Sequence, residues 1–267
     1  MSFFDFIYKR NLKIGLALSG GATYGAAHIG VLKVFEREGI KPHFVVGASA
    51  GALVGAAYCA GIPLEQISQM FNGMSWPTLV KPALTRSLSL FDTSPMEDYL
   101  RKNVGDCEFK DLQIPFAVVA CDIMTGERVF LNKGPLNPAV RASAAIPGLL
   151  SPVEIDGRLL VDGGTVDNFP VESLRPMGAN FIIGVDLSRT KNSTRRPTNM
   201  FEVFMNAINI MQSNGAVADS SLCDCYIRPK TEGLSRWSFS DSDRLQKAGM
   251  DAAEAALPKL KRNLHLK

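Results

Sequence analysis

Ser49 carries the clearest chemical signal in the sequence. It stands at the centre of Gly47-Ala48-Ser49-Ala50-Gly51, between an apolar run and a run of small residues. A Gly-x-Ser-x-Gly between a strand and a helix is typical of a serine nucleophile, because the glycines permit a sharp turn that lifts the hydroxyl clear of its neighbours. The N-terminus of the following helix also favours developing negative charge. The alternative interpretation is that Ser49 only caps this helix in a tight turn.

A serine nucleophile needs a base, which is usually a histidine. The chain has three histidines. His28 lies one turn into an apolar helix, and we expect it to be packed or hydrogen-bonded there. His43 begins the strand that leads to Ser49, so it lies at the wrong end of that strand. His265 falls in the terminal tail. The sequence therefore places none of the three as the base.

Asp162 is a candidate for the missing base. It ends an apolar strand and is followed by two glycines in the segment VDGGTVDNFPV. A carboxylate at this point can lie at the sheet edge where Ser49 emerges. The alternative is an ordinary Asp-Gly turn. Four further aspartates compete for the role and have the same alternative: Asp122, Asp156, Asp167 and Asp186.

The glycine-rich segment SGGATYG, residues 19–25, presents backbone N–H groups that can face an anion. Gly25 is followed by Ala26 and not by lysine, so the segment is not a P-loop. Ala22 stands where a dinucleotide-binding loop requires its second glycine. An oxyanion hole needs only donors near the serine, and a separate loop can supply them. The alternative is a helix N-terminus satisfied by solvent.

The composition is that of a globular α/β protein. The chain has 267 residues, of which 46% are hydrophobic and 21% charged, and its net charge of +3 is too small to indicate nucleic acid. The five scattered cysteines predict free, buried thiols in a reducing compartment. No cluster has the spacing of metal ligands, and no apolar run approaches the roughly 20 residues of a membrane span. No secretion signal is recognisable. These features predict a cytoplasmic protein without a metal or cofactor.

Apolar strands alternate with amphipathic helices along the chain. We expect strands at 12–19, 43–48, 116–122, 127–132, 179–187 and 225–229, and a hairpin at 153–164 whose turn is Asp156-Gly157. Helices are expected at 25–39, 50–61, 64–71, 95–103, 138–144 and 241–257. This βαβ series predicts one domain with a mainly parallel sheet and helices on both faces. The expected divisions are an N-terminal segment at 1–11, the domain at 12–257 and a tail at 258–267.

Four stretches together resemble the bacterial patatin-like phospholipases: LALSGGATYGAAHIGVLKVFE, VVGASAGALVGAAYCAG, RASAAIPGLLSPVEIDGRLLVDGGTVDNFPV and GANFIIGVDLS. The resemblance covers residues 12–257 and implies a three-layer α/β/α fold. It also implies a Ser–Asp dyad without histidine, in which Ser49 is the nucleophile and Asp162 the base. Backbone N–H groups of Gly20, Gly21 and Ala22 would bind the oxyanion. The implied reaction is acyl transfer to Ser49 and hydrolysis, which releases a fatty acid from a phospholipid or lysophospholipid.

The glycine-rich loop departs from the family pattern, which reads Gly-Gly-Gly-x-Arg-Gly. Ala22 replaces the third glycine, and Tyr24 replaces the arginine. Alanine keeps its N–H but restricts the φ angle, and the lost arginine removes a charge that could face a headgroup or brace the loop. This departure bears on headgroup preference and efficiency more than on reaction type. The alternative function is a patatin-fold protein that binds acyl chains or a partner with little turnover.

Two further segments bear on lipid contact. The first is an interfacial helix, with peripheral contact at the inner face of the membrane, formed by Phe3, Phe4, Ile7 and Tyr8 with Lys9, Arg10 and Lys13. Its alternative is docking on the protein's own surface. The second is an acyl-pocket wall or lid, formed by Met70, Phe71, Met74, Trp76 and Leu79. Its alternative is ordinary core packing.

Overall fold

The structure is a computed structural model that describes residues 12–84, 88–188 and 196–266. The N-terminal segment 1–11, which holds most of the proposed interfacial helix, lies outside these residues. Of the residues named for that helix, Lys13 is described.

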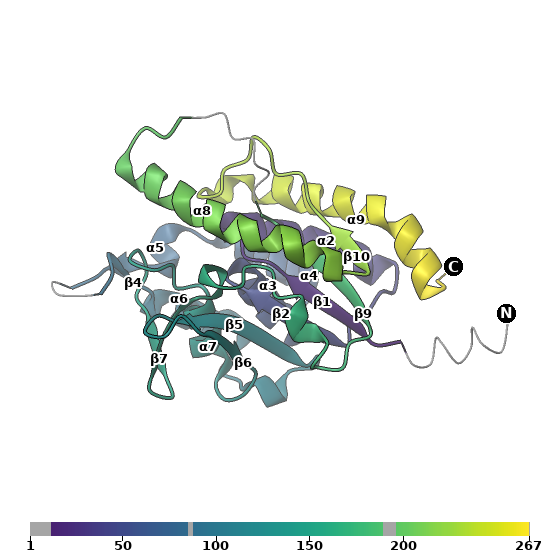
Figure 1. Ribbon diagram of the computed structural model, residues 1–267, viewed down its shortest axis with the longest axis horizontal. Helices are drawn as coiled ribbons and strands as arrows, with labels where there is room; N and C mark the ends of the chain where they lie inside the picture. The colour runs from purple at the N-terminus through teal and green to yellow at the C-terminus, as the bar shows by residue number, and fades with distance from the viewer. Residues whose placement is uncertain (1–11, 85–87, 189–195, 267) are drawn as a thin grey trace.

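The centre of the molecule is an eight-stranded sheet whose strand order is β10-β9-β1-β2-β5-β8-β7, with β6 paired to β5 (Figure 1). The first five strands in this order are mutually parallel, as the sequence predicts. Their bounds are β10 (Cys225–Ile227), β9 (Phe181–Val185), β1 (Ile14–Leu18), β2 (Phe44–Ala48) and β5 (Phe116–Asp122). The antiparallel strands at the other edge are β8 (Arg158–Asp162), β7 (Val153–Ile155) and β6 (Arg128–Leu131).

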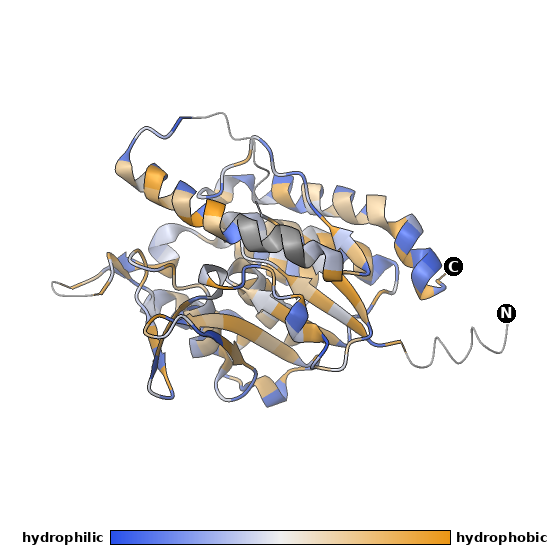
Figure 2. Ribbon diagram, viewed as in Figure 1, coloured by the Kyte–Doolittle hydropathy of each residue, from blue (hydrophilic) through white to orange (hydrophobic). Residues whose placement is uncertain are grey.

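The central parallel strands β9, β1 and β2 are continuous apolar runs, as expected where both faces of a sheet are covered (Figure 2). Leu16 and Leu18 belong to the large core on one face, whereas Ala17 belongs to the smaller core on the other face. The large core lies beneath the helices α2 (Ala26–Arg37), α3 (Ala50–Cys59), α4 (Leu64–Gly73), α7 (Leu136–Ser143) and α9 (Ser242–Leu264). This side of the molecule is therefore a thick helical layer.

The second face has a thinner cover. Phe169, Val171 and Leu174, around the short 3₁₀ turn Glu172–Leu174, pack against the strands there. The long helix α8 (Met200–Asp219) lies in front of the sheet in Figure 1, with α2, α3 and α4 behind. The three-layer α/β/α architecture is thus confirmed, although the two outer layers differ in thickness.

The last helix is longer than the sequence suggested. We expected it to end at residue 257 and a tail to follow, but α9 continues through Pro258 to Leu264. Leu257, Leu260 and Leu264 are all buried in the large core. Their helical spacing keeps one apolar stripe against that core, and its burial outweighs the hydrogen bond that proline removes, a loss of about 3 kcal/mol.

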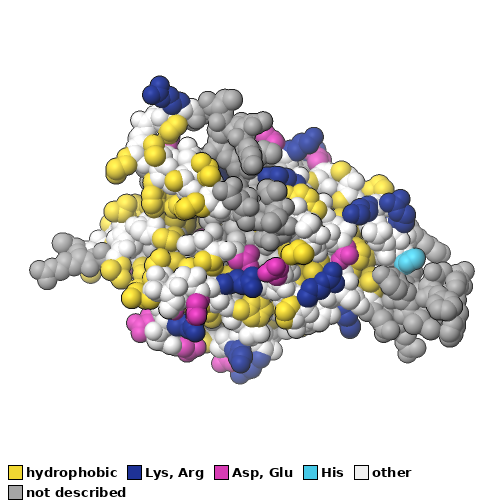
Figure 3. All heavy atoms as spheres, viewed as in Figure 1, with side chains coloured by type: hydrophobic (Ala, Val, Ile, Leu, Met, Phe, Trp, Pro, Cys, Tyr) yellow, Lys and Arg dark blue, Asp and Glu magenta, His cyan; other side chains and the backbone are white. Residues whose placement is uncertain are grey.

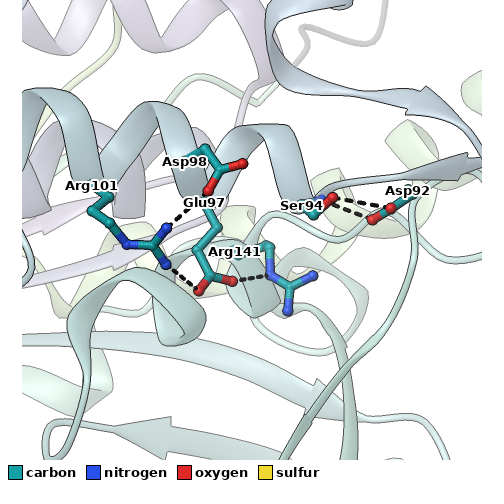
Figure 4. A network of polar contacts seen from close by, with 6 residues as sticks. All are labelled: Asp92, Ser94, Glu97, Asp98, Arg101 and Arg141. Carbon is teal, nitrogen blue, oxygen red and sulfur yellow. Dashed lines mark hydrogen bonds and ion pairs between the residues drawn. The ribbon is translucent and has the colours of Figure 1, made fainter.

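An ionic network fixes α7, the helix that leads to the candidate site (Figure 4). Glu97 of α6 (Ser94–Val104) forms ion pairs with Arg141 of α7 (2.9 Å) and with Arg101 (3.3 Å). The start of α6 is held in turn by Asp92, which accepts hydrogen bonds from the backbone and side chain of Ser94. Before α6 lie the short helix α5 (Trp76–Leu79) and the two-residue strands β3 (Lys81–Pro82) and β4 (Phe91–Asp92).

Candidate active site

Ser49 occupies a strained turn between β2 and α3, as its motif predicts. Its φ of 50° and ψ of −117° lie in a region that non-glycine residues rarely adopt. The flanking glycines are required by space. A Cβ on Gly51 would lie 2.1 Å from the carbonyl oxygen of Leu18, and one on Gly47 would lie 2.5 Å from that of Gly51. The turn therefore depends on both glycines, and the serine that it carries is half-buried.

Asp162 reaches Ser49 because of the register of three strands. Ala48 of β2 is paired with Val119 of β5, and the next residue, Ala120, is paired with Asp162 of β8. Because β6 pairs with both stretches of β5 from one side, β2 and β8 lie along its other side, and their C-terminal ends meet there. The Ser49 Oγ donates a hydrogen bond to Asp162 Oδ2 at 2.7 Å.

The Asp162 carboxylate is buried and held on both oxygens. Its Oδ1 accepts a hydrogen bond from the backbone N–H of Gly164 at 2.7 Å. Burial raises the pKa of Asp162 to about 6, while the hydrogen bonds from Ser49 and Gly164 and the charge of Arg236 act in the opposite direction. The result is a carboxylate that is a stronger base than an ordinary aspartate yet largely ionised at neutral pH.

Two of the three predicted oxyanion donors remain available to bind an oxyanion. The N–H of Gly20 donates to the carbonyl oxygen of Asn168 at 3.0 Å and is therefore engaged. The N–H groups of Gly21 and Ala22 have no acceptor within the described part of the chain, and both residues line the cleft beside Ser49. Ala22 has a φ of 51°, an unusual value for alanine. The first N–H of α3, at Ala50 directly after the serine, is a further donor.

Three residues of the site were not predicted as site residues from the sequence. Ser143, at the end of α7, accepts a hydrogen bond from the Ser49 N–H (3.0 Å) and donates one to the Val119 carbonyl (2.6 Å). The side-chain amide of Asn168 is buried in the cleft without a partner among the described residues. Arg236 also lines the cleft. Ser143 and Asn168 belong to the quoted stretch that contains Asp162, whereas Arg236 lies outside the four stretches and has no local pattern to identify it.

His28 and His43 lie where the sequence placed them, His265 does not, and none of the three is hydrogen-bonded to Ser49. His28 is fully buried, its Nε2 is 2.9 Å from the carbonyl oxygen of Ser19, and burial lowers its pKa to about 4. The Nδ1 of His43 accepts a hydrogen bond from the Ile14 N–H. His265 ends α9 in a left-handed conformation and does not lie in a frayed tail.

The competing aspartates are engaged elsewhere. Asp122 accepts from the N–H of Met124, and Asp156 forms the β7–β8 turn, as predicted. Asp167 pairs with Arg128 at 2.8 Å, and Asp186 accepts from the hydroxyl of Tyr226 at 2.6 Å. Asp162 is the aspartate that the fold brings to the serine.

An apolar cavity of about 620 Å³ adjoins the cleft. Trp237 borders both spaces, and the cavity is lined by Trp76, Pro77, Val80, Pro82, Leu90, Phe91, Leu149, Leu150 and Trp237. Of the five predicted pocket residues, only Trp76 lines it. The prediction is wrong for the other four, Met70, Phe71, Met74 and Leu79, which are buried with exposures of 6% or less. Their apolar spacing reflects ordinary helix packing.

The cysteines, possible metal ligands and possible membrane-spanning helices were also predicted from the sequence. All five cysteines are free thiols, and Cys107 and Cys223 are half-buried, not buried as predicted. Among the described residues, no group of three His, Cys, Asp or Glu side chains is arranged to hold a metal ion. Within the same residues, none of the helices combines the length and apolar character that crossing a membrane requires.

Fold and site together define an α/β protein in which a serine on a strained strand-to-helix turn is hydrogen-bonded to a buried carboxylate. Residues 16–175 match the model of the patatin-like phospholipase family. The chain belongs to this family, in agreement with the resemblance of its motifs.

Known relatives span several kingdoms. The chain is 33% identical over 187 residues to an uncharacterized NTE family protein of Mycobacterium tuberculosis, covering 69% of this chain and 51% of that protein. It is 24% identical over 279 residues to the lysophospholipase nte1 of Aspergillus fumigatus, covering 93% of this chain and 18% of that protein. The chain thus spans about half the length, or less, of these curated relatives.

Solved structures show the same fold. VipD from Legionella pneumophila superposes with a TM-score of 0.64 and 14% identity, covering 93% of this chain and 67% of that one. The type III effector ExoU superposes with a TM-score of 0.55 at the same identity, covering 93% of this chain and 53% of that one.

Proposed function

We propose that this protein is a serine lipid acyl hydrolase that cleaves fatty-acyl esters of phospholipids or lysophospholipids. The observation that carries the proposal is the 2.7 Å hydrogen bond between Ser49 Oγ and the buried Asp162 carboxylate. Family membership and a relative named as a lysophospholipase support a lipid ester as the substrate. Fatty-acid release from lysophospholipid micelles, compared between wild type and Ser49→Ala, tests the proposal.

In the proposed mechanism, Ser49 Oγ attacks the ester carbonyl carbon while Asp162 takes the hydroxyl proton. The oxyanion that forms is met by the N–H groups of Gly21, Ala22 and Ala50 and by the N-terminal end of α3. Collapse breaks the ester bond, and Asp162 returns its proton to the departing alcohol. Water then attacks the acyl-enzyme with Asp162 as base, which releases the fatty acid and restores Ser49.

The apolar cavity is the proposed binding site for the acyl chain. Its volume of about 620 Å³ is in the range of small-molecule pockets, and its lining is aliphatic and aromatic. Trp237 separates it from the cleft of Ser49. A chain that passes this side chain would place its carbonyl carbon at the serine and bury its methylenes, each contributing about 0.8 kcal/mol.

Narrowing the cavity should therefore change chain-length preference. Leu90 lines the cavity and is 65% exposed, whereas Leu84 of the same connection is 88% exposed and is not part of the lining. We expect Leu90→Trp to lower kcat/KM about 10-fold for a p-nitrophenyl ester with a long acyl chain and to leave a butyrate ester unchanged. Leu84→Trp is the matched control and should change neither. Equal losses on both esters for Leu90→Trp would contradict this assignment of the cavity.

Contact with a lipid surface is part of the proposal. Exposed apolar side chains gather over the N-terminal half of α8 and beside it, at the left of Figure 3. They include Leu84, Leu88, Leu90, Met200, Val203 and Phe204. The inner side of α8 packs Met205 and Ile208 into the cluster that contains Phe91, so helix and connection adjoin. We propose a cytoplasmic protein, consistent with its free thiols, that contacts membranes peripherally; sedimentation with phospholipid vesicles measures this contact.

The pH dependence of hydrolysis should report Asp162. The base must be ionised to accept a proton, and its pKa is raised to about 6. We therefore expect kcat/KM for a soluble ester to be constant above about pH 7 and to fall tenfold per pH unit below about pH 6. His28, with a pKa lowered to about 4, does not titrate in this range. An acid limb centred near pH 4 would contradict the raised pKa of Asp162.

A second candidate function, acyl-chain or partner binding with little turnover, is favoured by the covered state of the cleft. The space over Ser49 is about 20 Å³, close to the room that one water molecule needs. Met205, Ile208 and Asn209 of α8 line it. Turnover of a p-nitrophenyl ester distinguishes the two functions, because a binding protein would take up the acyl chain without releasing nitrophenol.

A further inference from the structure

Arg236 lies between β10 and α9, yet its side chain joins three distant parts of the chain. The residue is only 8% exposed. Its Nε donates to the Gly21 carbonyl oxygen and its Nη2 to that of Leu187, both at 3.4 Å, while its Nη1 donates to Asn209 Oδ1 of α8. A guanidinium so deeply buried requires fixed polar partners. Here those partners include the glycine-rich loop and the helix that covers the cleft.

The backbone around Arg236 holds the same loop. Residues 234–236, here called the strap, contact Thr23 and Tyr24 through their carbonyl oxygens. The contacts are Thr23 N to Arg236 O (3.3 Å), Thr23 Oγ1 to Ser235 O (3.0 Å) and Tyr24 Oη to Leu234 O (2.9 Å). The guanidinium carbon of Arg236 lies 5.3 Å from the centre of the Tyr24 ring, a cation–π distance. The strap therefore supports the loop along its length.

The contact with Gly21 sets the direction of one oxyanion donor. The Gly21 carbonyl and the Ala22 N–H belong to one planar trans peptide, so they point in opposite directions. Because Arg236 holds the Gly21 carbonyl, the Ala22 N–H of the same peptide points away from the guanidinium. Ala22 itself lines the cleft of Ser49. The φ of 51° at Ala22 is disfavoured for alanine and persists only where the surroundings enforce it.

We propose that Arg236 is a positioning residue, which fixes the Gly21–Ala22 peptide so that the Ala22 N–H meets the oxyanion formed at Ser49. This inference rests on the proposed acyl transfer to Ser49. Arg236 acts through the loop, and its bond to Asn209 joins that loop to α8. Its charge has a second effect, because it lowers the pKa of Asp162. Removing the side chain therefore changes both the rate and its pH dependence.

The test compares Arg236→Met and Arg236→Lys with Arg228→Met. Arg228 is the matched control, since it too holds a carbonyl oxygen, that of Ser188 at 2.8 Å, but does not contact the loop. With p-nitrophenyl butyrate, Arg236→Met should lower kcat about 10- to 100-fold and leave KM within about 3-fold. Its acid limb should move to higher pH. Arg236→Lys keeps the charge without the planar fork, so its acid limb should stay in place while kcat remains low.

Rates are expressed per serine titrated by a fluorophosphonate, and thermal unfolding is measured for every variant. A folded, titratable Arg236→Met with wild-type kcat and an unmoved acid limb would overturn the positioning role alone. Equal losses in Arg236→Met and Arg228→Met would do the same. Should Arg236→Met not fold, Arg236→Lys decides by its kcat. A wild type without Ser49-dependent hydrolysis would instead overturn the proposed function, and the positioning role with it.

Discussion

Ester hydrolysis by the purified protein should be abolished in Ser49→Ala, with kcat lowered about 10⁴-fold or more. The reason is that, among the described residues, Ser49 carries the hydroxyl that is bonded to Asp162, so its loss removes the nucleophile altogether. The fold should survive, because alanine removes one oxygen at a turn whose shape depends on Gly47 and Gly51.

A serine-directed fluorophosphonate provides an independent measurement. It should label the wild type and leave Ser49→Ala unlabelled. Ser240→Ala, at an exposed serine far along the chain, is the control and should be labelled and active like the wild type. Thermal unfolding should distinguish lost chemistry from lost structure. Near-wild-type hydrolysis by a folded Ser49→Ala protein would exclude the assignment of Ser49 as nucleophile.

The second large effect is a contrast between two variants. Asp162→Asn should lose nearly all activity, whereas a protein without histidines should keep most of it. Asparagine preserves the shape of the side chain but cannot take a proton from Ser49. The histidines are engaged elsewhere: His28 is bonded to Ser19, His43 is bonded to Ile14, and His265 ends α9.

The stability of Asp162→Asn carries a further expectation. The folded-state pKa of Asp162 is raised to about 6, above the reference value of 3.8, so its contribution to stability is present below about pH 4 and is lost as pH rises through 6. At pH 8 the wild type therefore bears the cost of a buried charge. Asparagine removes that charge and still accepts from the Gly164 N–H, so the free energy of unfolding should rise by on the order of 1–3 kcal/mol.

The histidine-free protein is best built with replacements that keep each local bond. His28→Gln retains a nitrogen donor toward the Ser19 carbonyl, and His43→Asn retains an acceptor for the Ile14 N–H. His265→Asn suits the left-handed φ of 51°. Rates are compared per folded protein. A folded but inactive histidine-free protein would establish a Ser–His mechanism, and a fully active Asp162→Asn would direct attention to Asp186 or Asp122 as the base.

Much of the frame of this protein is determined by the sequence alone. Apolar runs bounded by glycine and proline predict the parallel strands, because a strand covered on both faces has no polar side. The turn at Ser49 is equally local, because it requires Gly47 and Gly51, which lie two residues away on either side. No side chain fits at these two positions. The motifs also identified Asp162 as a candidate, from its place at the end of a strand before two glycines.

Tertiary structure decided what these parts do together. Asp162 lies 113 residues from Ser49, and only the register of β2, β5 and β8 selects it over the other aspartates. The pocket residues were misjudged because apolar spacing on a helix has the same form whether the side chains face a core or a cavity. Arg236 is 215 residues from Gly21, so no pattern of neighbouring residues in the sequence predicts its contact with the loop. Propensity and periodicity depend on neighbours in the chain, whereas strand order and register depend on which distant faces can be buried together.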